Sequence, residues 1–120
     1  MKFYRCPVCG NIITVIEGNE KVVRCCGKEL EELVPNTQEA ATEKHIPVCK
    51  REGDLVEVTV GEVEHPMQEE HYIMFIAQVV ENESTIVKLN PGDKPAATFT
   101  YKENAKIYAY CNLHGLWISK

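Results

Sequence analysis

The chain lacks the features of membrane, secreted and nucleic-acid-binding proteins. Its 120 residues contain no uninterrupted apolar run long enough to span a bilayer. The opening stretch, MKFYRCPVCG, has no apolar segment of the kind that marks a secretory signal. A formal net charge of -5 argues against sequence-independent nucleic-acid binding, which needs a basic face. We therefore expect a cytoplasmic protein that binds neither membranes nor nucleic acids.

Long helical patterns and internal repeats are also missing, and strand-like segments take their place. After a polar linker at roughly residues 34–42, DLVEVTVGEV alternates, with Val56, Val58 and Val60 on one face. HYIMFIAQVV alternates less cleanly, as a strand covered on both sides would. Further strand candidates, separated by turn signals such as NPGDKP, are STIVKL, AATFTY, KIYAYC and LWIS. This pattern predicts a small antiparallel β-sandwich.

Cysteine is concentrated in the first segment. Cys6 and Cys9 form a C-x-x-C, and Cys25 and Cys26 are adjacent. In a reducing compartment this spacing favours metal ligands over disulfides. The intervening IITVIEGNEKVVR is interpreted as a hairpin of two short strands that returns the second pair to the first. A segment of about 35 residues buries too little apolar surface to fold alone, and a metal is the usual remedy.

The residues raise two questions about these four cysteines: whether the adjacent pair forms a disulfide, and which metal they bind. A disulfide between the adjacent pair is disfavoured, because neighbouring Cα atoms lie about 3.8 Å apart and disulfides prefer about 4.4–6.8 Å. The identity of the metal stays open, since zinc and iron both accept four thiolates in a tetrahedron.

The four histidines all lie in the larger part of the chain, at His45, His65, His71 and His114. A histidine taken alone is more often a surface or hydrogen-bonded residue than a metal ligand. His114, however, follows Cys111 in a C-x-x-H turn at the end of the KIYAYC strand. Such a turn lets a thiolate and an imidazole reach one metal. The residues alone leave a mixed histidine–cysteine metal site and ordinary histidines both open.

Several motifs together resemble desulfoferrodoxin, the two-iron superoxide reductase family. They span nearly the whole chain in matching order and are CPVCGN, CCG, EKHIP, HPM, EHYI and CNLHGLW. The resemblance implies an all-β chain in which a desulforedoxin-like metal-bound hairpin domain, residues 1–36, precedes an immunoglobulin-like antiparallel β-sandwich, residues 37–120. It also implies two iron ions. The first would be held by Cys6, Cys9, Cys25 and Cys26, and the catalytic one by four equatorial imidazoles and an axial thiolate, from His45, His65, His71, His114 and Cys111.

The resemblance further implies a reaction, the one-electron reduction of superoxide to hydrogen peroxide at an open iron position opposite Cys111. Lys44 would attract the anion, and Glu43 would occupy that position once the iron is ferric. A rubredoxin-like carrier would return the electron, and the chain would form a homodimer. Trp117 is interpreted as packing around the C-x-x-H loop. Cys49 matches no ligand motif and is interpreted as a buried small apolar residue, with a reactive thiol as the alternative.

Two other functions compete with this one. A non-catalytic iron electron-transfer protein fits the first segment, and a zinc-stapled binding module would have two structural metals. Neither explains a five-ligand site with a vacant position, because structural zinc is normally four-coordinate and closed. Metal analysis with a visible spectrum would separate an open iron site from a zinc module, and rapid mixing of reduced protein with superoxide would separate the enzyme from the carrier.

Overall fold

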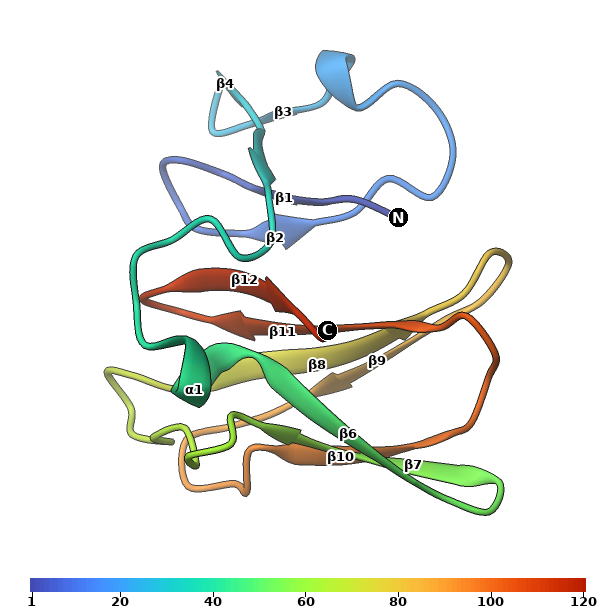
Figure 1. The fold of residues 1–120 in the computed structure, drawn as a ribbon. Helices are drawn as coiled ribbons and strands as arrows, with labels where there is room; N and C mark the ends of the chain where they lie inside the picture. The colour runs from blue at the N-terminus through green and yellow to red at the C-terminus, as the bar shows by residue number, and fades with distance from the viewer. The chain divides into compact units, whose positions relative to one another are not determined.

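The structure is a computed structural model that describes residues 1–120, and the chain divides into two compact units, Met1–Val34 and Pro35–Lys120. Almost all regular structure is β-strand (Figure 1). The α-helix α1, Thr42–His45, has four residues, and no helix is long and apolar enough to cross a membrane. The predicted all-β architecture is confirmed.

The first unit consists of two small sheets with a minimal core. A three-stranded antiparallel sheet has the order β2-β1-β5, and β3 pairs with β4 in a separate hairpin. The strands are β1 Phe3–Arg5, β2 Ile12–Ile13, β3 Arg24–Cys25, β4 Lys28–Glu29 and β5 Glu31–Leu33. Buried side chains are few in this unit and comprise Phe3, Tyr4 and Cys6. So small a core makes a stabilising metal physically reasonable.

The predicted hairpin between residues 12 and 24 is wrong. β2 pairs with β1 instead of β3, and Glu20–Val22 form a 3-10 turn. Asn19 begins that turn, because its side-chain oxygen accepts a hydrogen bond from the Lys21 backbone N–H at 3.0 Å. An asparagine side chain that binds nearby backbone in this way competes with a strand ladder.

The second unit is an antiparallel β-sandwich, as predicted. One sheet has the order β10-β7-β6 and the other β12-β11-β8-β9. Their strands are β6 Pro47–Glu52, β7 Leu55–Val60, β8 Ile73–Val79, β9 Ser84–Lys88, β10 Ala96–Thr100, β11 Lys106–Cys111 and β12 Gly115–Ile118. The facing sides of both sheets meet in one core, which comprises Val56, Val58, Val60, Ile73, Ile76, Phe99, Ile107, Ala109 and Cys111. The alternation of β7 is therefore confirmed.

Strand β6 is absent from the predicted strands. It lies at the edge of its sheet, and Pro47 is its one buried residue. An edge strand tolerates proline and polar side chains, because one side of its backbone has no ladder partner. The run from Pro47 to Glu52 therefore shows none of the apolar alternation that marks the inner strands.

Candidate metal centres

The four cysteines of the first unit converge. Their sulfur atoms all lie within 4.8 Å of one another, with Cys9 Sγ 3.5 Å from Cys25 Sγ. Backbone N–H groups of Val8 and Cys9 each donate to Cys6 Sγ at 3.4 Å. These bonds, led by that of Cys9, lower the pKa of Cys6 to about 6 and favour its thiolate.

The adjacent pair is accommodated by a two-residue hairpin loop. β3 and β4 are joined by Cys26 and Gly27, whose φ angles are +52° and +72°. Two successive positive φ values are the conformation of a type I′ turn, which matches the twist of an antiparallel hairpin. The turn brings both sulfurs to the cluster without a disulfide, and all six cysteines of the chain are free. Contact with the Cys6 sulfur raises the pKa of Cys25 to about 12 and so disfavours its thiolate. A bound cation would remove this unfavourable effect.

The four histidines of the second unit form a closed ring of imidazoles. Neighbouring ring centroids lie 4.6 Å apart for His45 and His65, 4.7 Å for His65 and His71, 5.1 Å for His71 and His114, and 4.9 Å for His114 and His45. Each neighbouring pair is steeply inclined, by 75° to 89°. The diagonal pair His45 and His71 is 6.3 Å apart and inclined by only 29°. This is the arrangement of four planar ligands around one point.

The nitrogen atoms that face this point lie in contact with one another. His45 Nε2 lies 3.1 Å from His65 Nε2 and 3.2 Å from His114 Nδ1. Cys111 Sγ lies 3.9 Å from His114 Nδ1, and the ligand atoms of His45, His71, Cys111 and His114 all fall within 4.8 Å of one another. A cation at the centre would turn these crowded lone pairs into ligands.

Hydrogen bonds to backbone carbonyls fix the tautomers of two rings. His45 Nδ1 donates to Ala41 O at 2.7 Å, and His65 Nδ1 donates to Pro66 O at 2.7 Å. A carbonyl only accepts, so the proton resides on Nδ1 and the Nε2 lone pair is free to bind metal. His71 Nε2 is buried with no hydrogen-bond partner. A buried nitrogen of this kind needs an explanation, and a metal ion supplies one.

Burial keeps the ring nitrogens in the form that binds metal. Desolvation lowers the pKa of His65 to about 4 and also lowers the pKa of His45 and of His71. Desolvation raises the pKa of Cys111, while backbone N–H groups of Leu113 and His114 oppose that shift by donating to its sulfur. The site thus offers neutral imidazoles and a sulfur poised to accept hydrogen bonds once it is ionised.

Trp117 packs against the ring of four histidines. Its Nε1 donates to His114 O at 3.0 Å, and its ring stacks on that of His45 with centroids 4.9 Å apart and 28° between planes. The packing role predicted for Trp117 holds, but the hydrogen bond was not predicted. The need of a buried indole N–H for an acceptor is the signal that could have revealed it.

Comparison with known proteins places the chain in a family. A family model for desulfoferrodoxin matches residues 37–120, and one for the desulfoferrodoxin N-terminal domain matches residues 1–33. The chain belongs to the desulfoferrodoxin family. It is 43% identical to desulfoferrodoxin from Syntrophotalea carbinolica, over 100% of this chain and 96% of that protein. Its two ligand sets match the two iron centres that the sequence motifs implied.

Solved structures of similar proteins agree with this assignment. The superoxide reductase from Treponema pallidum superimposes with a TM-score of 0.77 and 32% identity, covering 99% of this chain and 98% of that one. The superoxide reductase (1Fe-SOR) from Giardia intestinalis gives a TM-score of 0.56 and 31% identity. That match covers 64% of this desulfoferrodoxin family member and 95% of the Giardia chain.

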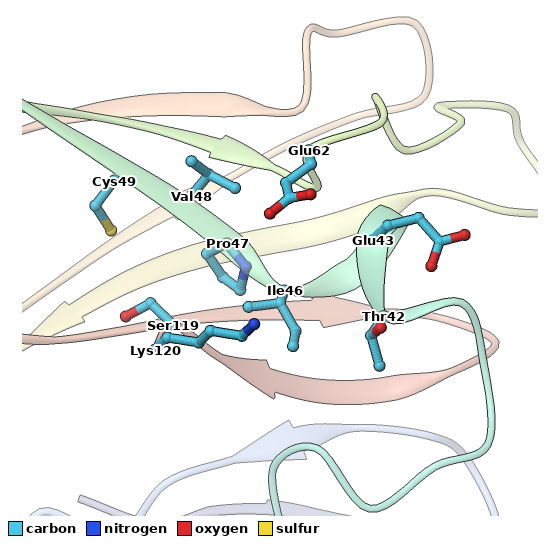
Figure 2. Close-up of a pocket in the computed structure, with 9 residues that line it drawn as sticks. All are labelled: Thr42, Glu43, Ile46, Pro47, Val48, Cys49, Glu62, Ser119 and Lys120. Atoms are coloured by element: carbon cyan, nitrogen blue, oxygen red, sulfur yellow. The ribbon is translucent and has the colours of Figure 1, made fainter.

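Glu43 and Lys44 lie on α1, directly before His45, and both side chains are exposed. The two side chains carry opposite charges, and each charge affects the pKa of one histidine of the site. Desolvation lowers the pKa of His45, and the negative charge of Glu43 partly opposes that shift. Desolvation also lowers the pKa of His71, and the positive charge of Lys44 adds to that shift. Figure 2 shows the Glu43 carboxylate pointing away from Cys49, which lies at the other end of the same pocket. Both side chains are thus within electrostatic range of the metal site.

Cys49 is not buried, and the interpretation as a small apolar core residue is wrong. It lies opposite Val58, so it faces the inner side of its sheet. Because β6 is an edge strand, that side is incompletely covered, and Cys49 borders a pocket of about 320 Å³. Desolvation raises the pKa of the Cys49 thiol, while a hydrogen bond with Ser119 opposes the shift. The thiol is therefore not activated as a nucleophile.

Proposed function

We propose that the chain is a superoxide reductase, which converts superoxide to hydrogen peroxide at iron bound by His45, His65, His71, His114 and Cys111. The closed ring of imidazoles with inward lone pairs carries this proposal. Four histidines and one thiolate exceed the ligand set of a structural zinc site, which is normally four-coordinate. Proteins similar to this chain over most of its length carry the name superoxide reductase.

The ligand set determines which chemistry the site supports. A ferrous ion held by these four imidazoles and the Cys111 sulfur would supply the single electron that reduces superoxide, with two protons completing hydrogen peroxide. The Cys111 sulfur is fully buried at 0% exposure, and two backbone N–H groups are directed at it. Such bonds stabilise the thiolate and tune its electron donation.

Lys44 is the residue proposed to attract the substrate anion. The chain as a whole carries a net charge of -5, which repels superoxide. Exposed charges fade beyond about 8 Å at physiological salt, so the nearest cation dominates the local field. Lys44 lies one residue before His45, and its charge contributes to the lowered pKa of His71, which supports this role. Glu43, its neighbour, is proposed as a carboxylate that occupies the iron after oxidation.

The first metal site is proposed to serve a separate role. Residues 1–36 would form the domain that holds iron through its four cysteines, and residues 37–120 the catalytic domain. The small core of the first unit makes a structural role for its metal reasonable, with electron relay as a further role. We also keep the rubredoxin-like electron donor, the homodimer and a cytoplasmic location as proposals. Free thiols at all six cysteines are compatible with a reducing compartment.

Rapid mixing of reduced, iron-loaded protein with superoxide tests the function. We expect fast oxidation of the protein, with one hydrogen peroxide released for each superoxide consumed and no oxygen formed. Slow oxidation without peroxide would instead indicate a non-catalytic electron carrier. Metal analysis of the same sample should give two iron atoms per chain, whereas two zinc atoms and a colourless protein would indicate a structural module.

A further inference from the structure

Asn112 connects the loop that carries Cys111 to the segment that carries His71. Its Nδ2 donates to Glu70 O at 3.1 Å, and its Oδ1 accepts from the Tyr72 backbone N–H at 3.0 Å. The Asn112 backbone N–H also donates to Tyr72 O at 3.2 Å. One residue thus binds the main chain on both sides of His71.

These bonds occur where the strand ladder becomes irregular. β11 and β8 pair regularly as far as Tyr110 and Phe75, and the register then shifts before Cys111 pairs with Ile73. Such a bulge weakens the ladder locally and redirects the side chains that follow. The Asn112 amide replaces ladder bonds at this point, so the metal-binding end of the sheet keeps a defined spacing.

His71 depends on its main chain more than His45 and His65 do. His45 and His65 each hold their orientation through an Nδ1 bond to a backbone carbonyl. His71 has no corresponding ring hydrogen bond, and its buried Nε2 has no partner. Its own backbone N–H and carbonyl exchange hydrogen bonds with Gln68 at 3.1 and 2.9 Å. Asn112 provides the remaining restraint, on the two residues that flank His71.

We propose that Asn112 is a positioning residue that sets the placement of His71 relative to Cys111. The inference rests on the proposed metal centre but not on the reaction carried out there. Groups that hold ligands in place commonly change metal affinity by about 10- to 100-fold when they are removed. The expected effect of losing the Asn112 amide is a loss of this size, confined to the histidine–cysteine site.

The chain contains a matched control for this substitution. Asn36 makes a similar donor and acceptor pair on the edge of β12, but with a single residue: its Nδ2 donates to Ile118 O at 3.3 Å and its Oδ1 accepts from Ile118 N at 2.9 Å. Ile118 does not flank a metal ligand. Asn112→Asp and Asn36→Asp each keep the acceptor oxygen, remove the donor and place a carboxylate against a carbonyl. They therefore make the same chemical change at and away from the ligands.

The test compares iron retention in the full, iron-loaded chain under increasing chelator. For N112D we expect the chelator concentration that removes half of the iron from the histidine–cysteine site to fall about 10- to 100-fold. The four-cysteine site, read from its own visible band, should be unchanged and serves as an internal control. N36D should retain iron as the parent chain does. Repulsion from the Glu70 carbonyl should push the new carboxylate away from the Tyr72 N–H, so amide exchange at Tyr72, measured by mass spectrometry, should accelerate in N112D alone.

The proposal is overturned if N112D retains iron like the parent while Tyr72 exchanges faster, because Asn112 would then support only the fold. It is also overturned if N36D loses iron as readily as N112D, or if Tyr72 exchange does not change. Should N112D fail to fold, Asn112→Ser removes the amide without adding charge and is judged by the same outcomes. Superoxide turnover by the parent chain is measured separately, so a failure of the proposed reaction is distinguishable from a failure here.

Discussion

Substitution of Gly61 by alanine tests whether the turn after β7 sets the position of α1. Gly61 has a φ of +84°, and a Cβ built on it would lie 2.4 Å from Val63 O and 2.7 Å from Lys44 Cα and C. The same turn is bonded to the α1 segment, through Gly61 N to Ile46 O at 3.2 Å and Val63 N to Glu43 O at 2.9 Å. All of these contacts involve main-chain atoms, which cannot rotate away as a flexible side chain would. A methyl group must therefore displace the segment that carries Lys44.

The size of the effect follows from two contributions. A side chain in the left-handed region costs roughly 1–2 kcal/mol. Overpacking against atoms that cannot yield adds about 1–3 kcal/mol. Gly92 isolates the first contribution, because its φ is +90° and nothing lies within 4 Å of its built Cβ. We therefore expect G92A to lose roughly 1–2 kcal/mol and G61A roughly 2–5 kcal/mol.

Denaturant unfolding followed by tryptophan fluorescence measures the difference. Trp117 is the single tryptophan and is 1% exposed, so its emission reports on the β-sandwich. For a domain of this size, each kcal/mol also lowers the melting temperature by about 4–8 °C. The rate of reaction with superoxide should fall in G61A and not in G92A, because only the first moves Lys44. Equal losses of stability in the two variants would refute the close-approach argument.

Three further predictions concern charges around the imidazole ring. Lys44→Ala should slow the second-order reaction with superoxide about 10-fold at low salt and flatten its salt dependence. Substitution of the exposed Lys50 on β6 by alanine is the control. An unchanged low-salt rate for K44A would disprove electrostatic steering by Lys44. Glu43→Ala should leave that rate within about twofold, because the carboxylate is proposed to act only after oxidation, and a tenfold loss would contradict this. In iron-free protein, the pKa of His65 near 4 lies below its ordinary value of about 6.5, so the unfolded state binds the extra proton. Stability should then be present above about pH 6.5 and fall by about 2–3 kcal/mol towards pH 4.5, and a urea midpoint independent of pH would contradict the shift.

Burial on one or both faces made the inner strands recognisable in the sequence. β7 and β8 lie inside their sheets, so their side chains had to match the core, and both were recognised from the sequence. The first unit gave no such constraint. The β-branched residues Ile16 and Val22 are 88% and 71% exposed, so the strand-like composition of their segment does not mark a buried face. Strand propensity without a surface to cover was a misleading signal there.

The ligand residues were predictable, but the groups that hold them were not. Spacing alone indicated the four cysteines of the first site, whereas the histidines and Cys111 of the second were assigned through the resemblance to the desulfoferrodoxin family. Asn112 stands within the same short motif as Cys111 and His114, yet nothing local reveals what it binds. The Asn112 side chain reaches Glu70 and Tyr72, which lie 42 and 40 residues away in the sequence. The need for glycine at position 61 likewise arises only in the folded chain, where this turn lies against the backbone of Lys44.

The histidine–cysteine site draws its ligands from the ends of both sheets. His45 precedes β6 and His65 follows β7, and these strands are neighbours in one sheet. His71 precedes β8, while Cys111 and His114 flank the turn from β11 to β12 in the other sheet. An ion bound by all five therefore cross-links the two sheets at one end of the sandwich. Because the ion would link these separate segments, its loss should loosen this end first, and the core between Val58 and Ala109 should open later.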